Sequence, residues 1–203
     1  MLLAMVRVAD KKRPAELLNA VAAYLVRHGV SDLSLRPLAR AVGSSPRGLL
    51  YHFGSKQKLI ARAIARLRER QRSSFSGMRE ARYDQPSDAC RAMWRYMSAP
   101  QSEALFKFFL ETYSVALRHP KLHGEFLHSA VEDWIEFIAE PWIRKGHPKE
   151  AARAFATIVL AGFRGFLLDY CASHDRDRID RAVELWLGSL DAILPSEEVP
   201  HVR

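Results

Sequence analysis

Cysteine is scarce in this sequence, because Cys90 and Cys171 are the only two among 203 residues. Both lie in segments with helical periodicity, and their spacing matches no metal-binding motif. A disulfide-linked secreted fold and a cysteine-ligated metal centre are therefore disfavoured. We expect two reduced thiols, no bound metal and no cofactor.

Long apolar runs are also lacking. The longest, Ala154–Phe163, lies between Arg153 and Arg164 and is far shorter than the roughly 20 residues that a membrane-spanning helix needs. Residues 1–10 make too short an apolar stretch for a signal peptide, and Arg7 interrupts it. We therefore expect a soluble, cytoplasmic protein without membrane association.

Recognisable catalytic patterns are missing too. The sequence contains no zinc-protease His pair with an intervening Glu, no Gly-rich phosphate loop and no Gly-x-Ser-x-Gly motif. His119 and His123 are four residues apart, but Pro120 interrupts the helix between them. We predict that the protein is not an enzyme.

Acidic residues are few in the first third of the chain. Residues 1–72 contain 15 Lys or Arg and 4 Asp or Glu, whereas residues 73–203 contain 16 and 19. The overall excess of +8 therefore arises entirely from residues 1–72. Such a local excess is the electrostatic footprint of a polyanion, and duplex DNA is the partner we expect. A membrane surface is a poorer alternative, because the basic residues do not lie opposite a broad apolar stripe.

The stretch Ser34–Leu59 has the pattern of three successive helix starts. We expect Ser34, Ser45 and Ser55 to cap these starts, each hydroxyl accepting a backbone N–H of the first turn. A glycine ends each of the first two helices, as a residue free to adopt positive φ should. Two short helices joined by a tight, Gly-containing turn form a helix-turn-helix motif.

The segment from Gly43 to Ile60, GSSPRGLLYHFGSKQKLI, resembles the recognition helix and the next helix start of the TetR family of bacterial repressors. The run LYHFGSK is its most specific part. The family most often has Tyr where this chain has Leu50, whereas Tyr51 and His52 follow the family pattern. The resemblance covers about the first quarter of the chain.

The resemblance implies that the helix beginning at Pro46 enters the major groove of DNA with its N-terminal end toward the bases. Arg47 would then read a guanine, while Tyr51, His52 and Lys56 would contact phosphates. The predicted DNA-contacting residues are Ser34, Arg36, Ser44, Ser45, Pro46, Arg47, Gly48, Tyr51, His52 and Lys56.

The rest of the chain has helical periodicity and no strand pattern. We predict an all-α fold of about nine helices, with a helix-turn-helix DNA-binding domain at 1–60 and a helical effector-binding and dimerisation domain at 61–203. Besides a helix that begins at Pro14, the helices expected outside the motif are 87–98, 101–118, 122–145, 149–173 and 176–194.

The second domain is rich in large aromatic side chains, which could line a pocket for an apolar ligand. Core packing is the alternative explanation for each of them. We expect a largely apolar effector, with Glu111 among the charged candidates nearby. The predicted ligand-binding residues are Trp94, Met97, Phe109, Tyr113, Trp134 and Phe163.

The last two helices carry more than one apolar stripe each. A helix that is apolar on most sides is buried on most sides, which indicates a covering partner subunit. The resemblance likewise implies a homodimer formed by the last two long helices. We expect Gly162 and Gly188 to lie where these helices approach closely. The predicted interface residues are Phe155, Val159, Gly162, Phe166, Ala182, Trp186, Ser189 and Leu190.

Three functions are compatible with these patterns. The first is a dimeric repressor that binds a palindromic operator and is released by a small apolar ligand. The second is a helical DNA-binding protein without an effector, whose second domain binds another protein. The third, a helical enzyme, has no supporting motif.

Overall fold

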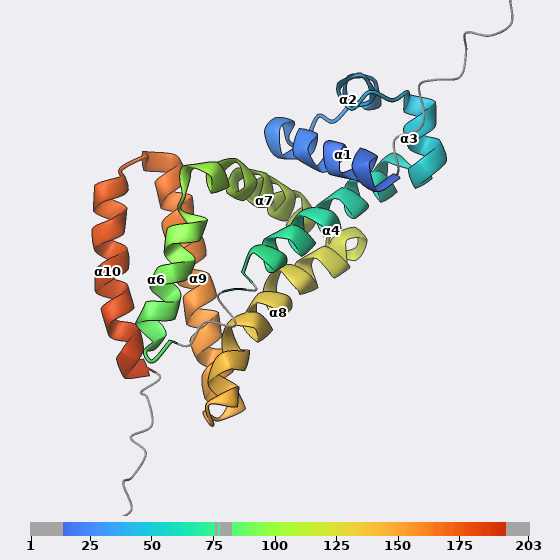
Figure 1. Ribbon diagram of the computed structural model, residues 1–203. Helices are drawn as coiled ribbons and strands as arrows, with labels where there is room; N and C mark the ends of the chain where they lie inside the picture. Colours follow the sequence, from blue (N-terminus) through green and yellow to red (C-terminus); the bar gives the residue numbers. More distant parts are fainter. Residues whose placement is uncertain (1–13, 76, 78–82, 194–203) are drawn as a thin grey trace, which may run out of the picture. The chain divides into compact units, whose positions relative to one another are not determined.

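The computed structural model describes residues 14–75, 77 and 83–193 (Figure 1). These described residues form α-helices and no strands, so the predicted all-α fold is confirmed. The described part of the chain contains nine helices, the number expected. The first residues of the predicted DNA-binding domain, 1–13, and the predicted helix end at 194 lie outside the described residues.

Contacts within the chain define two compact units. The first comprises the described residues up to Ser74 together with Lys107–Val115, and the second comprises Phe75–Phe106 and the described residues from Ala116 onward. By contacts, the division therefore falls after Ser74. The functional boundary that we place at residue 60 stays a prediction.

The first unit holds four complete helices: α1 Pro14–His28, α2 Leu35–Ala41, α3 Pro46–Phe53 and α4 Lys56–Ser74. Leu17, Val21 and Leu25 recur every four residues, so they share one face of α1, and all three are completely buried. This face packs against α4, which contributes the buried side chains of Leu59 and Ala63. The helix-turn-helix thus rests on a small apolar core.

The second unit holds the remaining helices, with the middle of α7 belonging to the first unit: α6 Pro86–Met97, α7 Pro100–Arg118, α8 Pro120–Arg144, α9 Lys149–Ser173 and α10 Arg176–Ile193. Three of these helices begin at a proline, whose fixed φ suits a first turn and whose missing N–H costs nothing there. The observed bounds agree with the expected ones to within two residues.

Helix α8 departs from the regular helix that we expected. His123 has non-helical backbone angles, φ −118° and ψ 21°, which place a kink one turn after the start at Pro120. Pro141 lies inside the last turn, where it removes one backbone donor. Neither irregularity could be predicted from the periodicity of the apolar residues.

Helix α9 forms the centre of the second unit and packs against α8. Among the described residues it is the one helix long and apolar enough to cross a membrane by length and composition. Its side chains Phe155, Val159 and Phe163 are, however, buried by the protein itself. A position in the protein core therefore explains the apolar character of this helix.

Candidate nucleic-acid interface

The first turn of α3 is held by a cap from within the motif. The Ser45 hydroxyl accepts the Gly48 backbone N–H at 3.0 Å, and Pro46 occupies the first helical position. Arg47 between them is exposed, whereas Gly48 is buried. Gly48 therefore lies on the packed side of the helix, and its contact with DNA stays a prediction.

The two faces of α3 differ sharply in burial. Leu49 and Phe53 are buried and anchor the helix in the first unit. Tyr51 projects outward with 84% of its surface exposed, and Leu50 is 38% exposed. Positions 47, 50 and 51 are three and four residues apart, so they share one outward face. This face is the part of α3 that another molecule can reach.

His52 is placed between the two faces. Its ring lies edge-on to Tyr51, with centroids 5.3 Å apart, and to Phe53 at 6.2 Å. The side chain is half-buried, whereas Tyr51 beside it is almost fully exposed. The Nε2 atom of the imidazole is buried, and a phosphate contact by His52 stays a prediction.

Ser34 occupies the cap position of α2, but the capping bond that we predicted is absent. A capping hydroxyl usually accepts the N–H of the second or third helical residue. Pro37 is the third residue of α2 and has no N–H to donate. Ser34 remains exposed, and its hydroxyl does not cap the helix. Arg36, two residues further along the chain, is exposed too.

The start of α4 follows the expected design. The Ser55 hydroxyl accepts the Lys58 backbone N–H at 3.1 Å, and Gly54 adopts φ +83° to reverse the chain between α3 and α4. Lys56 is half-buried beside this turn. One contact was missed by the sequence analysis: the Arg62 guanidinium lies over the Phe53 ring, 5.9 Å from its centroid, and ties α4 to the end of α3.

A second contact missed from the sequence holds the loop before the motif. The Glu111 carboxylate, on α7, accepts backbone N–H groups of Val30 at 3.0 Å and of Ser31 at 2.8 Å. A Cβ on Gly29 would lie 2.4 Å from this carboxylate. Partial burial raises the pKa of Glu111, but the hydrogen bonds from Ser31 and Val30 outweigh burial, so the pKa lies below its ordinary value.

No local signal announces the Glu111 contact, because about 80 residues separate its partners. We had placed Glu111 among charged groups near a ligand pocket. The structure places it instead in the first unit, beside the loop that leads into the helix-turn-helix.

The six predicted ligand-binding residues are divided between the two units. Trp94 and Phe163 stack with centroids 6.1 Å apart in the second unit, whereas Phe109 and Tyr113 pair at 5.4 Å in the first. The Trp94 indole N–H donates to Asp180 at 2.8 Å. Trp134 contacts Phe75 and Phe137, and Met97 is half-buried.

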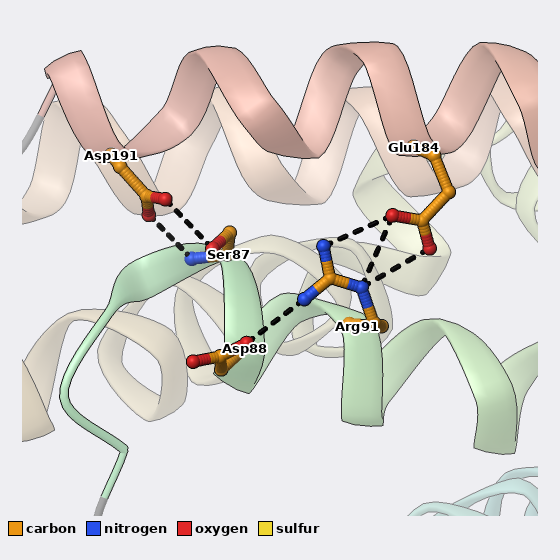
Figure 2. A network of polar contacts seen from close by, with 5 residues as sticks. All are labelled: Ser87, Asp88, Arg91, Glu184 and Asp191. Carbon is orange, nitrogen blue, oxygen red and sulfur yellow. Dashed lines mark hydrogen bonds and ion pairs between the residues drawn. The ribbon is translucent and has the colours of Figure 1, made fainter.

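A line of polar contacts joins α6 to α10 in the second unit, and Figure 2 shows part of it. Asp191 accepts hydrogen bonds from the Ser87 backbone N–H and hydroxyl, both at 2.8 Å. Arg91 forms a two-pronged contact with Glu184 at 3.0–3.1 Å and an ion pair with Asp88 at 2.9 Å.

The same line continues toward the other end of α6. Arg176 donates to the Ser98 carbonyl at 2.6 Å and to Asp180 at 2.7 Å. We call these contacts, with the Trp94–Asp180 bond, the α6–α10 seam. Burial, with a smaller contribution from Asp191, raises the pKa of the neighbouring Cys90 thiol to about 12, so this thiol stays protonated.

Several predicted dimer-interface residues are covered by their own chain. Phe155, Val159 and Leu190 are completely buried, because they form the core of the second unit. Gly162 is where α9 and α10 approach closely, since a Cβ there would lie 2.5 Å from Trp186 of the same chain. Within the described chain nothing lies within 4 Å of the Cβ position of Gly188, so a close approach there stays a prediction.

The outward surface of α9 and α10 is carried by other residues. Leu185 is 81% exposed and Leu168 is 53% exposed, an unusual exposure for side chains of this type. Phe166, Ala182 and Trp186 are half-buried between the core and this surface. The exposed members of the surface are Ile158, Leu168, Leu185, Gly188, Ser189 and Ile193.

The described residues contain no group of three or more His, Cys, Asp or Glu side chains placed to hold a metal ion. The exposed polar groups of the first unit include Arg47, Tyr51, Ser34 and Arg36. Such a set of hydroxyl and guanidinium donors suits recognition of base edges and phosphates.

The comparisons with known proteins agree with this geometry. Residues 17–63 match the sequence model described as bacterial regulatory proteins, tetR family. No curated protein matches the chain significantly.

Solved structures support the same fold over nearly the whole chain. A transcriptional regulator from Rhodococcus sp. Rha1 superposes with a TM-score of 0.73 at 19% identity, covering 89% of this chain and 97% of its own. A protein described as a TetR-family transcriptional regulator, from Rhodococcus sp., gives 0.68 at 19% identity, with 89% and 98% covered. The multidrug binding protein EbrR, solved with imidazole, gives 0.63 at 18% identity, with 94% of both chains covered.

At these identities the solved structures establish the fold alone, whereas the match at residues 17–63 covers the helix-turn-helix itself. The capped start of α3, its outward Arg47 and Tyr51, and the basic character of residues 1–72 are the features of a DNA-binding regulator. The helix-turn-helix of this chain is therefore that of a DNA-binding regulator, similar to bacterial regulatory proteins of the tetR family.

Proposed function

We propose that this protein is a cytoplasmic, dimeric repressor that binds a palindromic operator and leaves it when a small, largely apolar ligand binds. One observation carries the proposal: Arg47 and Tyr51 project from α3, while the opposite face of this helix is buried in the first unit. The net positive charge of residues 1–72 supports a polyanionic partner.

Base recognition falls to Arg47. It lies in the first turn of α3, and its guanidinium is exposed. An arginine at the N-terminal end of a helix in the major groove can donate two hydrogen bonds to the O6 and N7 atoms of guanine. Leu50 stands beside it with an exposed apolar side chain, which suits contact with the methyl group of thymine.

We propose that residues near Arg47 contact the DNA phosphates. Tyr51 offers a phenol hydroxyl from the same face, and Lys56 lies near the first turn of α4, whose N–H groups favour an anion. Ser34 is a strong candidate for a phosphate contact, because its hydroxyl does not cap α2. Arg36, Ser44 and Ser45 complete the set of residues that we propose to fix the protein on the DNA backbone.

Dimerisation would use the outward surface of α9 and α10. The buried residues Phe155, Val159 and Leu190 support this surface from inside, and the exposed Leu168 and Leu185 would meet the partner subunit. Gly188 and Ser189 are exposed and small, so they would allow close approach of the partner's helices. Two DNA-binding units held in this way read two half-sites of a palindrome.

Induction requires only that the ligand prefer a conformation with lower DNA affinity. DNA affinity then falls by the ratio of the ligand's affinities for the two states. The alternative is a second unit that binds another protein and no small molecule. A screen of apolar compounds for thermal stabilisation and for release of DNA separates the two, because only the first function responds to them.

The DNA-binding part is tested by selecting duplex sites from a random pool and measuring binding by fluorescence anisotropy. Arg47→Ala should cost about 1–3 kcal/mol on the selected site and little on random duplex. Lys56→Ala is the matched control, because it should weaken both duplexes equally and reduce the slope of log K against log salt by about 0.9. Equal losses for Arg47→Ala on both duplexes would remove its base-reading role.

A further inference from the structure

Phe75 is the first residue after α4, and its side chain is completely buried. Three aromatic rings of the second unit surround it: Tyr96 of α6 at a centroid distance of 4.6 Å, Trp134 of α8 at 5.3 Å and Phe137 of α8 at 5.9 Å. We call these three rings the aromatic box. Phe75 is its occupant.

The contacts in the box suit an aromatic ring in particular. All three rings meet Phe75 at steep angles, between 63° and 85°. Such edge-to-face pairs arise because the positive edge of one ring attracts the negative face of another. An aliphatic group of the same size fills the space but lacks this attraction. The box therefore distinguishes aromatic from aliphatic occupants.

The three rings of the aromatic box are less buried than Phe75. Tyr96, Trp134 and Phe137 are only half-buried, whereas Phe75 is wholly enclosed. The Tyr96 hydroxyl and the Trp134 indole N–H donate no hydrogen bond to any described residue. Trp94 differs, because its indole N–H is bound to Asp180.

The position of Phe75 in the chain connects the box to DNA binding. Phe75 directly follows Ser74, the last residue of α4, and α4 is one continuous helix from Lys56, beside the end of α3. Burial therefore holds the residue that directly follows the last turn of α4. If another ring takes the box, Phe75 must leave and the end of α4 loses this attachment.

We propose that the aromatic box is the effector site, that Phe75 occupies it in the DNA-binding state, and that the effector is a planar aromatic molecule which displaces the Phe75 ring. The proposal rests on the ligand response put forward under the proposed function. Phe75 belongs to the same chain as the box, so its effective concentration there is high. A free ligand must compete with this linked ring. Removing the tethered ring should abolish this competition.

The first experiment needs no DNA. Toluene and methylcyclohexane have the same carbon skeleton, and only toluene is aromatic. Calorimetric titration of the full chain should show that Phe75→Ala binds toluene at least tenfold more tightly than the wild type, because the cavity left by the ring stays available to an apolar guest. It should bind methylcyclohexane more weakly than toluene. Equal toluene affinity of Phe75→Ala and wild type would overturn the proposal.

Phe75→Leu provides the same test if Phe75→Ala does not fold, because it keeps an apolar side chain in the box but removes the ring. It should bind toluene more tightly than the wild type and less tightly than Phe75→Ala. Phe155→Leu is its matched control: Phe155 is equally buried and also lies edge-on to a tryptophan, Trp142, but it is in the second turn of α9 and away from α4 in the sequence. This control should keep wild-type toluene affinity.

The second experiment measures duplex DNA binding with and without saturating toluene. Toluene should weaken DNA binding by the wild type and by Phe155→Leu at least tenfold. It should leave Phe75→Ala unchanged, because this variant has no ring to displace. Unchanged DNA binding by toluene-saturated wild type would overturn the displacement. A wild type that binds no duplex would refute the proposed function, while the calorimetric comparison would still decide the occupancy of the box.

Discussion

The first turns of α3 and α6 are stabilised in opposite ways. In α3, the Ser45 hydroxyl accepts an N–H from Gly48, three residues along the chain. In α6, the residue at the cap position forms no capping bond, and Asp191 of α10 accepts the Ser87 N–H across a separation of 104 residues. The first unit thus fixes its functional helix locally, whereas the second fixes α6 through its tertiary fold.

This difference has a physical cause. A local cap closes a small loop and loses little chain entropy, so it forms wherever the residues allow. A contact such as that of Asp191 exists only after both helices have packed. We therefore expect local substitutions to affect α3 alone and substitutions in the α6–α10 seam to affect the whole second unit.

The largest expected effect concerns the packing of α9 on α10. Gly162→Glu should destabilise the second unit by about 3 kcal/mol, because the new side chain must displace the Trp186 ring. Gly188→Glu is the matched variant at an open position, and it should leave the melting temperature of the isolated chain nearly unchanged while yielding monomers. Thermal melts by circular dichroism and sedimentation measure the two effects. A folded dimer of Gly188→Glu would place the partner surface elsewhere.

The next effect tests the long-range cap. Asp191→Ala should destabilise the protein by about 1–2 kcal/mol, because it leaves the Ser87 N–H and hydroxyl without their acceptor in a buried place. Arg91→Ala removes a more exposed part of the seam and should cost less than about 1 kcal/mol. Denaturant unfolding compares them. A larger loss for Arg91→Ala would show that the ion pair, not the cap, holds α6.

A smaller effect distinguishes the two serines of the helix-turn-helix. Ser45→Ala should destabilise the first unit by about 1 kcal/mol through loss of the α3 cap. Ser34→Ala should leave stability unchanged, because its hydroxyl caps nothing, and should weaken binding to all duplexes alike. Denaturant melts and anisotropy give both quantities. A stability loss in Ser34→Ala would show that the Ser34 hydroxyl does cap α2, contrary to the structure.

The smallest effect is the pH dependence contributed by Glu111. Because its folded pKa is lowered, its stabilising contribution is present above the ordinary pKa of Glu and is lost as pH falls through the folded value. Glu111→Gln should therefore lose stability near neutral pH and show a flatter decline in acid. Denaturant melts between neutral and acidic pH measure this difference. Parallel curves of stability against pH for the wild type and Glu111→Gln would show that Glu111 does not contribute to the pH dependence.

The fold was largely predictable, because its signals are local. Pro86, Pro100 and Pro120 begin helices, and glycines at positive φ end α1 and α3. The face of α3 was also predictable, since residues three and four apart must share a side. The Ser34 cap was predicted wrongly, although its cause, Pro37 at the third helical position, is itself local.

The apolar stripes of α9 and α10 show where prediction from one chain fails. Periodicity identified Phe155, Val159 and Leu190 as members of apolar faces, but it could not say whether the same chain or a partner covers each face. The contacts of the aromatic residues were unpredictable for the same reason. Helical spacing could not show that Trp94 bonds to Asp180 or that Trp134 packs against Phe75.

By itself, the sequence determined the all-α fold, the helix bounds, the helix-turn-helix and the basic character of its first third, because each depends on neighbouring residues or on composition. Only the tertiary structure decided that Glu111 holds the loop before the motif, that Asp191 caps α6 and that Phe75 fills the aromatic box. These contacts join distant segments, and their partners are selected by packing, which no local pattern encodes.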